Sequence, residues 1–523
     1  MHKSRKPKPV KISINGKAIL AAAGEKLIDV AEKNGIIIPS MCRNNDVEHF
    51  TSCMVCLVTD KSTGNLIPSC SIEVNDGMDI DTRNAEIMEA RKTALELLLS
   101  EHAGDCDAPC RIACPAFMDI PQMNRLIAVG QTDKALEVVM EDIALPGVLG
   151  RICPAPCEGA CKRKPIDEPV AICLLKRFAA DESVTIPRKK TTTGTKKVAV
   201  IGSGPAGLAA GYYLHRKGIQ AVVIDRHPLP GGSLRYDIPD EKLDKSVLDR
   251  EIKVIRDAGV QFTMGQNVDS QRFSEICQSY DAVVIATGNF SPGMDAWGLS
   301  NNGKQILVDK NSYLTNIGHV FAIGNVNRKM QLAIRSQAQG KEVAVAVEQL
   351  LNELPVTGEI RRFNSTLGKL MPEEHEEYLK EGSRRPRQAE TEPGSGLLQE
   401  QAAAEAARCL HCDCRKPDSC RLRQYADEYK AQKRRFAYSQ RKPVKKHMQQ
   451  NLLVYEPGKC IKCGICVRLT ALHREEFGFT FVGRGFDVEV GVPFNEPVAK
   501  AFIKTADLVA RACPTGALAA FEK

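Results

Sequence analysis

The chain has 523 residues, of which 26% are charged, 43% are hydrophobic and 20 are cysteines. This length predicts several domains, and the composition argues against general disorder. The formal net charge of +8 is modest, and the basic residues lie mainly in 1–9 and 421–446. We interpret these runs as a solvated helix or a docking face for an acidic partner, so no nucleic-acid partner is expected.

The cysteines are the most informative part of the composition. No apolar run approaches the length of a membrane span, and no signal-peptide core follows the basic start, so we expect a cytoplasmic protein without membrane insertion. Disulfides are rare in that compartment, and the cysteines therefore predict metal ligation, with buried or paired thiols as the alternative. Thiolates at three-residue spacings suit iron–sulfur clusters, because one loop presents several sulfurs to one metal core.

Residues 8–84 are predicted to form a small [2Fe–2S] domain. Alternating residues about Asn15-Gly16 predict a β-hairpin, and a helix is expected from Lys26 to Asn34 with Gly35 at its cap. Four cysteines with one close pair then suit a [2Fe–2S] cluster in a loop over a sheet; zinc, whose ligands usually come as two close pairs, is the alternative. The four are Cys42, Cys53, Cys56 and Cys70.

This cysteine spacing departs from the plant-type pattern. It resembles the N-terminal ferredoxin domain of the large iron–sulfur subunit of respiratory NADH dehydrogenase, which implies a ferredoxin-type β-grasp. In those subunits a histidine four residues before a cysteine ligates a [4Fe–4S] cluster. In this chain, His102 lies four residues before Cys106, at the end of a helix predicted over 86–102. A lone histidine is more often a surface residue. However, without the solitary Cys277 nineteen cysteines remain, and His102 completes five sets of four.

Residues 85–190 are predicted to form a helical domain with two [4Fe–4S] clusters. The runs CDAPCRIACP and ICPAPCEGAC resemble the helical domain of the glutamate synthase small subunit and of dihydropyrimidine dehydrogenase, where interleaved motifs bind two clusters. That resemblance assigns Cys110 and Cys161 to one cluster. It assigns a second set to the other cluster: Cys114, Cys153 and Cys157.

The chain departs from that family at two places. His102 and Asp105 stand where the family has cysteines, so we infer that His102 and Cys106 complete the first set. The family's second cluster takes a non-cysteine ligand from a downstream helix. Lys176 stands at about that position, and Cys173, one helical turn earlier on a similar face, is the candidate fourth ligand.

Residues 195–360 are predicted to form a Rossmann-like FAD domain. After a polar linker over 188–197, the strand KVAVIG enters a glycine turn, and a second strand ends in an acid, which is the setting that the dinucleotide fingerprint requires. The later runs GGSLRYDIP, DAVVIATG and HVFAIGNV resemble flavin-side segments of the glutamate synthase family and favour FAD over NAD. The candidate cofactor-binding residues are Gly202, Gly204, Pro205, Ala206, Gly207, Asp225, Arg226, Gly232, Leu234, Thr287, Gly288, Gly324 and Asn325.

The resemblance in this domain also has departures. Asp237 replaces a glycine, and Asn325 replaces the aspartate that contacts the ribityl chain, which keeps hydrogen-bonding ability but removes a charge. The relatives insert a nicotinamide-binding domain before the last flavin strand. Here only about thirty residues separate Gly288 from His319, and a Rossmann half needs far more chain than that.

The C-terminal third is predicted to hold two more sites after a linker over 361–404. In the region 405–450, four cysteines within twelve residues suit a [4Fe–4S] cluster, with structural zinc as the alternative and His411 as a bystander: Cys409, Cys412, Cys414 and Cys420. Residues 451–523 are predicted to be a ferredoxin-like module with one [4Fe–4S] cluster, because a Cys-x2-Cys-x2-Cys triplet is completed by a distant Cys-Pro in bacterial ferredoxins. Its ligands are Cys460, Cys463, Cys466 and Cys513.

The fold class expected from these patterns is multidomain, α/β and α+β. The predicted protein is an oxidoreductase component with FAD, one [2Fe–2S] and about four [4Fe–4S] clusters. Its expected partners are a molybdopterin or hydrogenase-type catalytic subunit and an NAD(P)H-binding diaphorase-like subunit. One alternative is a self-sufficient NAD(P)H-dependent reductase of the glutamate synthase type. The other is a zinc-bound scaffold or nucleic-acid-binding protein.

Overall fold

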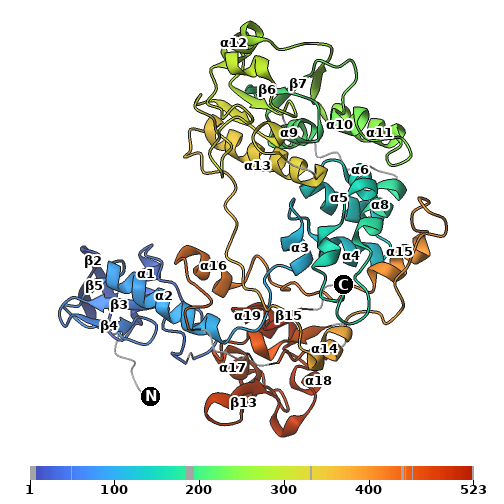
Figure 1. Ribbon diagram of the computed structural model, residues 1–523. Helices are drawn as coiled ribbons and strands as arrows, with labels where there is room; N and C mark the ends of the chain where they lie inside the picture. The colour runs from blue at the N-terminus through green and yellow to red at the C-terminus, as the bar shows by residue number, and fades with distance from the viewer. Residues whose placement is uncertain are drawn as a thin grey trace. The chain divides into compact units, whose positions relative to one another are not determined.

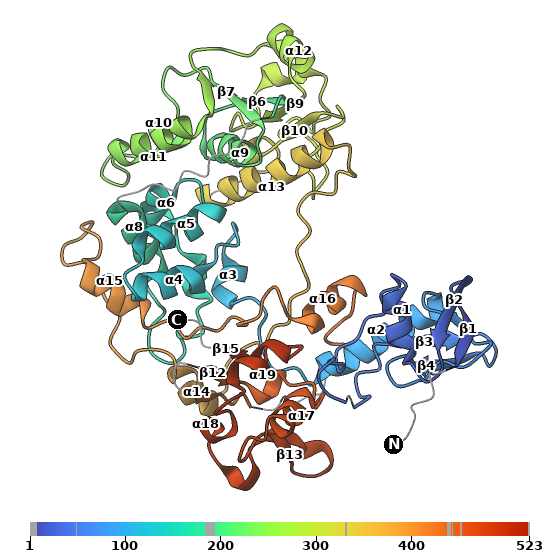
Figure 2. The same ribbon diagram turned by 180° about the vertical axis from the view of Figure 1, so that it is seen from behind.

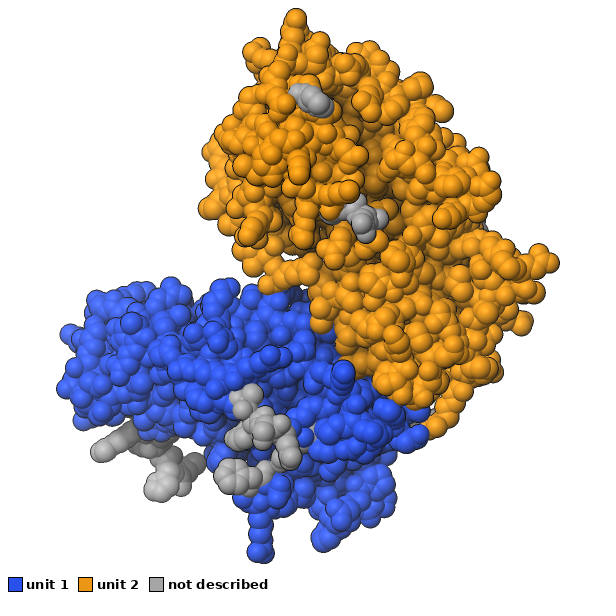
Figure 3. Space-filling model, in the orientation of Figure 1, with its two compact units in different colours: residues 1–107, 362–380, 413–523 blue, residues 108–361, 381–412 orange. Residues whose placement is uncertain are grey.

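The structure is a computed structural model that describes residues 8–48, 50–183, 194–329, 332–436, 441, 443–449 and 452–520. The start of the basic tail (1–7) and residues 188–193 of the predicted linker therefore lie outside the described residues. The chain forms two compact units, coloured separately in Figure 3. Unit 1 comprises Met1–Asp107, Arg362–Lys380 and Asp413–Lys523, and unit 2 comprises Ala108–Arg361 and Glu381–Cys412. Among the described residues, no helix has the length and apolarity that a membrane span needs.

Unit 1 begins with a five-stranded sheet in the order β2-β1-β5-β3-β4 (Figure 1). The predicted hairpin is confirmed: β1 and β2 pair antiparallel, and Asn15 and Gly16 both have positive φ angles, as a two-residue turn of this type requires. The predicted helix is also present, with Lys26 and Asn34 as its caps. The elements are β1 (Pro9–Ile14), β2 (Lys17–Ala22), α1 (Leu27–Lys33), β3 (Leu57–Asp60), β4 (Asn65–Pro68), β5 (Asp79–Asp81) and α2 (Ala85–Ser100).

The helix α2 contacts part of the basic run 421–446. Its buried positions include two charged residues as well as apolar ones. Arg91 donates a hydrogen bond to the Tyr429 hydroxyl at 3.1 Å, and Arg435 pairs with the fully buried Glu96 at 2.8 Å. Part of the run 421–446 is therefore held inside unit 1 by hydrogen bonds and carboxylates, which corrects its interpretation as a solvated or docking face.

The C-terminal module of unit 1 packs with the start of the chain. Its three-stranded sheet has the order β11-β12-β15, and β13 pairs with β14. One hydrophobic cluster joins Cys42 and Leu95 from the N-terminal part to Leu453 and Phe502 from the last seventy residues. The elements are η3 (Pro372–Glu374), α14 (His375–Leu379), α16 (Arg421–Glu428), β11 (His447–Gln449), β12 (Leu453–Tyr455), η4 (Pro457–Lys459), α17 (Ile465–Leu472), β13 (Thr480–Val482), η5 (Gly485–Asp487), β14 (Glu489–Gly491), η6 (Pro493–Asn495), α18 (Val498–Ala501), α19 (Ala506–Ala512) and β15 (Leu518–Ala520).

Unit 2 combines a helical part with a parallel sheet. The sheet has the order β10-β9-β6-β7-β8, with every neighbouring pair parallel, which is the arrangement of a Rossmann-like half. Helices α9 and α13 lie side by side against it, as Figures 1 and 2 both show. The helices of the helical part are α3 (Pro109–Ala113), α4 (Ile120–Ala128), α5 (Thr132–Asp142), α6 (Pro146–Ile152), α7 (Pro156–Gly159), α8 (Ile172–Glu182) and α15 (Gln399–Ala406).

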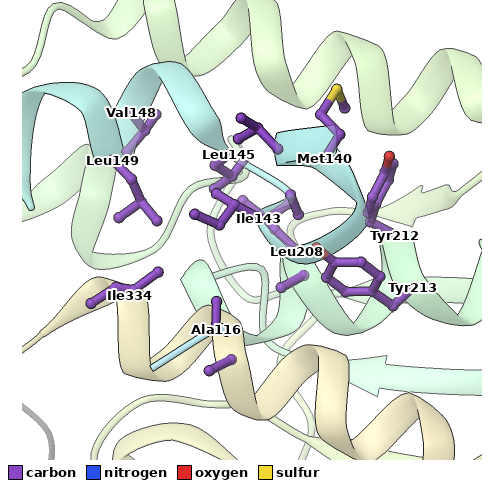
Figure 4. Close-up of a cluster of buried hydrophobic side chains, with 14 of the residues drawn as sticks. Ala116, Met140, Ile143, Leu145, Val148, Leu149, Leu208, Tyr212, Tyr213 and Ile334 are labelled. Carbon is purple, nitrogen blue, oxygen red and sulfur yellow. The ribbon is translucent and has the colours of Figure 1, made fainter. Parts of the chain in front are cut away.

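The remaining elements of unit 2 build the nucleotide domain. They are β6 (Lys197–Ile201), α9 (Pro205–Arg216), β7 (Gln220–Ile224), α10 (Ser233–Tyr236), α11 (Lys245–Ala258), β8 (Gln261–Thr263), α12 (Ser270–Ser279), β9 (Ala282–Ile285), η1 (Pro292–Trp297), β10 (Val320–Ala322), η2 (Gly324–Val326) and α13 (Ala333–Leu351). One hydrophobic core joins this domain to the helical part: Figure 4 shows Met140 and Leu145 of the helical part beside Leu208 and Tyr212 of α9. The two parts of unit 2 are thus packed together.

The predicted linker, residues 361–404, is divided between the units, and in each unit its side chains contact other elements of that unit. In unit 1, Glu374 is fully buried and accepts a hydrogen bond from the Val444 backbone at 2.7 Å. In unit 2, Arg387 pairs with Glu158 at 2.8 Å, and Arg177 pairs with Glu390 at 2.9 Å. Polar composition suggested a loose connection, but these charged side chains have specific partners.

A buried glutamate connects the helical part to the nucleotide domain. Glu251 of α11 accepts hydrogen bonds from the backbone N–H groups of Gly147 and Val148, at 2.5 Å and 2.9 Å, in the first turn of α6. A carboxylate there satisfies N–H groups that have no partner within the helix. Burial raises the pKa of Glu251 to about 7, although the two hydrogen bonds act in the opposite direction.

This glutamate should make the stability of unit 2 depend on pH. The folded-state pKa lies above the ordinary value of 4.5, so the folded state binds more protons and loses stability as the pH rises from about 4.5 to about 7. The loss is on the order of 3 kcal/mol. We expect Glu251→Gln to flatten the fall in melting temperature over this range, measured by calorimetry. The exposed Glu275→Gln should keep the wild-type slope, and equal slopes in all three chains would contradict the prediction.

Candidate functional site

The four cysteines predicted to bind a [2Fe–2S] cluster lie together and are buried. They come from the loop after α1, the turn before β3 and the end of β4. The thiols of Cys53 and Cys70 interact with the Cys42 sulfur and lower its pKa. A hydrogen bond from Cys70 lowers the pKa of Cys56 to about 7. The residues present therefore converge as the ligands of one small cluster must.

The backbone between predicted ligands is bent in the same way at several sites. Four non-glycine residues with positive φ lie within cysteine loops: Met54, Ala155, His411 and Lys462. A residue in this region is uncommon and persists only where its surroundings require it. Such a turn curls the chain so that neighbouring N–H groups and side chains face one centre, which suits an anionic cluster. His411 is thus a turn residue, and its Nδ1 lies 3.3 Å from Arg125.

The four cysteines of the C-terminal module line one pocket. The other lining residues are mostly apolar and include Tyr455, Val490 and Leu518. Burial raises the pKa of Cys460 to about 12, and repulsion from Cys513 adds to it. Four thiols around an apolar cavity fit a [4Fe–4S] cluster, because deprotonated thiolates need the positive irons there.

This cavity adjoins the N-terminal site. Cys463 interacts electrostatically with Cys42, and both belong to the same buried cluster of side chains. The first and last modules of the chain therefore bring their predicted sites next to each other, although about 390 residues separate the two regions in the sequence.

The second set of the helical part surrounds a buried lysine. The Lys176 ammonium lies 3.7 Å from the Cys173 sulfur. Burial alone would lower the pKa of Lys176, but the attraction of four thiolates raises it: Cys173, Cys153, Cys157 and Cys114. Cys173 also interacts directly with Cys153 and Cys157. The structure thus brings the candidate fourth ligand to the same place as the other three, with a positive charge beside them.

The charge of Lys176 should raise the reduction potential of the cluster bound here. A buried positive charge favours the more negative, reduced state. We expect Lys176→Met to lower the midpoint potential of one [4Fe–4S] cluster, by on the order of 100 mV. Redox titration followed by electron paramagnetic resonance would measure it. The exposed Lys253→Met, on α11, serves as the control and should leave every potential unchanged; an unchanged potential in Lys176→Met would refute the prediction.

The remaining eight predicted ligands divide between the units. His102, Cys106, Cys414 and Cys420 belong to unit 1, whereas Cys110, Cys161, Cys409 and Cys412 belong to unit 2. The unit boundary thus falls inside the run 409–420 that the sequence groups as one site. No three His, Cys, Asp or Glu side chains of the described ranges converge on one metal ion; a [4Fe–4S] cluster instead takes each ligand on a different iron.

The predicted nucleotide-binding segments meet at the carboxyl ends of the parallel strands. A Cβ atom on Gly202 would lie 2.3 Å from the carbonyl oxygen of Ala286, and one on Gly232 would lie 2.6 Å from the Cα of Gly204. A Cβ on Gly324 would lie 3.3 Å from the Ala206 Cβ. One cradle is therefore formed by four segments: the glycine turn, the GGSL segment, the ATG strand and the last strand. It lies at the edge of the sheet where open α/β sheets bind their ligands.

Asp225 directly follows β7, and both of its carboxylate oxygens have hydrogen-bond partners. One carboxylate oxygen of Asp225 accepts hydrogen bonds from the Ser203 backbone N–H, at 2.6 Å, and hydroxyl, at 2.7 Å. The other accepts from the His227 backbone N–H at 2.8 Å and lies 2.9 Å from its Nδ1. Burial would raise the pKa of Asp225, but these hydrogen bonds lower it. Asp225 thus stays ionised and fixes the glycine turn at Ser203.

The glycine turn gives a sharp test of this cradle. A Cβ on Gly207 would lie 1.9 Å from the Gly202 carbonyl oxygen, whereas one on Gly204 would meet nothing within 4 Å. We expect Gly207→Ala to destabilise the domain by roughly 1–3 kcal/mol and to reduce bound flavin. Gly204→Ala should keep the melting temperature of the flavin-free protein. Thermal unfolding of flavin-free protein measures both, and a wild-type melting temperature for Gly207→Ala would overturn the prediction.

Several other predicted cofactor residues have less specific surroundings. Arg226 is exposed, Leu234 is buried, and Thr287 contacts Met294. Asn325 donates a hydrogen bond to Asn289 at 3.3 Å. Sequence reasoning missed Gln339, whose side-chain oxygen accepts a hydrogen bond from the Gly324 N–H at 2.7 Å, because Gln339 lies on α13 and belongs to no motif.

Three family profiles match the chain. A 2Fe-2S iron–sulfur cluster binding domain matches residues 7–85. Dihydropyrimidine dehydrogenase domain II, with a 4Fe-4S cluster, matches residues 85–187. An NAD(P)-binding Rossmann-like domain matches residues 200–260. The chain therefore carries an N-terminal 2Fe-2S domain, a 4Fe-4S domain and a Rossmann-like domain, which confirms the fold class and the resemblances read from the sequence.

Curated relatives share these regions. NADP(+)-dependent formate dehydrogenase subunit beta of Moorella thermoacetica is 38% identical over 207 residues, covering 35% of this chain and 29% of that protein. NADPH-Fe(3+) oxidoreductase subunit beta of Geobacter sulfurreducens is 36% identical, over 35% and 28%. The glutamate synthase [NADPH] small chain of Bacillus subtilis is 35% identical, over 35% and 40%. The chain thus matches less than half the length of each of these relatives.

Proposed function

We propose that this protein is an iron–sulfur flavoprotein subunit that relays electrons within a larger oxidoreductase. The observation that carries the proposal is the coexistence, in one chain, of buried convergent cysteine sets and a glycine cradle at the end of a parallel sheet. Of the three relatives, one is named as a formate dehydrogenase beta subunit, one as an oxidoreductase beta subunit and one as a glutamate synthase small chain. Iron–sulfur clusters carry single electrons, and a flavin exchanges one or two.

The proposed domain layout follows the predicted one. A [2Fe–2S] domain occupies 8–84, a helical domain 85–190, an FAD domain 195–360 and a ferredoxin-like module 451–523. The chain's own residues would hold the flavin at Gly202–Gly207 and Asp225, and the clusters at the cysteine sets. The packing of unit 2 supports this layout, because one core joins the helical part to the nucleotide domain.

The short segment before β10 supports a relay in preference to a self-sufficient reductase. Between Gly288 and Val320, the described chain forms only the 3₁₀ helix η1 and isolated bridges. The described residues contain one parallel sheet, so a second nucleotide domain of the Rossmann type has no strands from which to form. We therefore propose that NAD(P)H is oxidised or formed on a diaphorase-like partner subunit.

The other proposed partner is a catalytic subunit. The relative from Moorella is named as part of a formate dehydrogenase, and the N-terminal domain resembles that of respiratory NADH dehydrogenase. We propose a molybdopterin or hydrogenase-type catalytic subunit, reached through the neighbouring sites at Cys42 and Cys463. Cys42 and Cys463 belong to one buried cluster of side chains, which would give electrons a short route between the first and last modules.

Composition and reduction of the purified chain test this function. We expect about 18 irons per chain (2 + 4 × 4) and one FAD. Dithionite should bleach the visible absorbance of the isolated chain, whereas NADH and NADPH should leave it unchanged. Bleaching by either nucleotide would favour the self-sufficient reductase. Zinc with no visible chromophore would refute the relay and favour the scaffold.

A further inference from the structure

Cys106 and Cys414 lie next to each other in unit 1, although about 300 residues separate them in the sequence. The Cys414 backbone N–H donates to the Cys106 carbonyl oxygen at 3.0 Å. The Ser365 N–H donates to the Cys106 sulfur at 3.4 Å, and the Cys106 N–H returns a bond to Ser365 at 3.0 Å. Both thiols are buried, and they interact electrostatically.

Cys420 belongs to the same group. It is buried, and it interacts electrostatically with both Cys414 and Cys106. It precedes α16, whose first residue, Arg421, donates its N–H to the Pro514 carbonyl at 2.9 Å. A Cβ on Gly516 would lie 2.3 Å from the Cys414 sulfur. The C-terminal module therefore closes over these thiols and leaves room only for glycine at this point.

His102 reaches this group from the end of α2. The next residue, Ala103, donates its N–H to the Gly458 carbonyl at 2.7 Å. Lys459 interacts electrostatically with both His102 and Cys414, and its side chain would lie 2.6 Å from a Cβ on Gly104, so His102 and Cys414 lie in the same part of unit 1. Within the described part of the chain, the His102 Nδ1 atom is shielded from solvent and has no hydrogen-bond partner. A buried imidazole nitrogen without a partner is costly unless a ligand satisfies it.

We propose that His102, Cys106, Cys414 and Cys420 bind one [4Fe–4S] cluster. This set differs from the grouping by sequence, which unites Cys409, Cys412, Cys414 and Cys420 and assigns His102 and Cys106 to Cys110 and Cys161. The remaining four ligands then form a second set, and all of them belong to unit 2: Cys110, Cys161, Cys409 and Cys412. In unit 2 the Arg163 side chain donates to the Arg408 carbonyl at 2.5 Å, which brings the chain next to Cys409 close to the segment that follows Cys161.

The new set has a structural consequence. A cluster held by these residues crosslinks the end of the N-terminal domain to the start of the C-terminal third, because its ligands come from segments that only the fold unites. Closing a chain loop of this length restricts the unfolded state. Lys459, which is 3% exposed and pairs with Glu456, adds a positive charge near the cluster.

Iron counts of paired variants distinguish the two groupings. This inference rests on the proposed function, so the wild type must first contain iron; zinc in its place would refute the function itself. If the proposal holds, Cys106→Ala with Cys414→Ala removes one cluster, or about four irons, and Cys409→Ala with Cys414→Ala removes two, or about eight. The grouping by sequence predicts the reverse, and that result would overturn the proposal.

A milder variant covers the case in which a double substitution prevents folding. His102→Cys keeps four ligands, so we expect full iron content. Replacing a neutral ligand by a thiolate adds negative charge, and the reduction potential of one cluster should fall. The paramagnetic signal that shifts should be the one that disappears in Cys414→Ala and in Cys420→Ala, each made singly. Its disappearance in Cys110→Ala and its survival in Cys414→Ala would refute the shared cluster.

Discussion

At each predicted cluster site, several thiolates of like charge would share a space from which water is largely excluded. Their mutual repulsion and their burial both oppose ionisation, as the raised pKa values of Cys460 and Cys420, each to about 12, show. Such an arrangement is stable only when something positive lies among the sulfurs. Bound iron supplies most of that charge, and buried lysines supply more: Lys176 lies beside one set and Lys459 beside another. We infer that the chain folds around its cysteine sets in the way that this balance of charge requires.

The chain path of unit 1 follows from the same constraint. The first hundred residues and the last hundred share one core, and the predicted sites at Cys42 and Cys463 adjoin each other within it. Basic residues of the C-terminal third pair with carboxylates of the same unit; Arg423, for example, lies 2.6 Å from the buried Asp107, next to Cys106. Sites that are far apart in the sequence are thereby held at short separations, which a relay of single electrons requires.

Unit 2 is organised around its parallel sheet. Here the parallel sheet places its glycine turn, its acid and its last strand at one edge, and Asp225 fixes the turn through Ser203. Glu251 then joins the sheet domain to α6, which leads directly to Cys153. The glycine cradle and the second cysteine set are thus parts of one packed body.

The local features of this protein follow from short stretches of its sequence. The hairpin at Asn15-Gly16, the glycine turn at 202–207 and the Cys-x2-Cys-x2-Cys triplet are each specified by a few contiguous residues, whose conformational preferences act over one turn or loop. The N-terminal cysteine set was predicted from its spacing, and Cys173 was predicted from a family resemblance together with helical spacing. Gln339 and Lys459 carry no such pattern, and the structure alone revealed their contacts.

Which distant segments meet depends on the packing of the whole fold. Sequence spacing groups Cys414 with Cys409, its near neighbour in the chain, whereas the fold places it beside Cys106. The same holds for the contact between the first and last modules and for the basic run, which pairs with α2. Pairing across hundreds of residues depends on the packing of whole cores and on the charges buried within them. Those energies belong to the assembled fold, and no short stretch of sequence contains them.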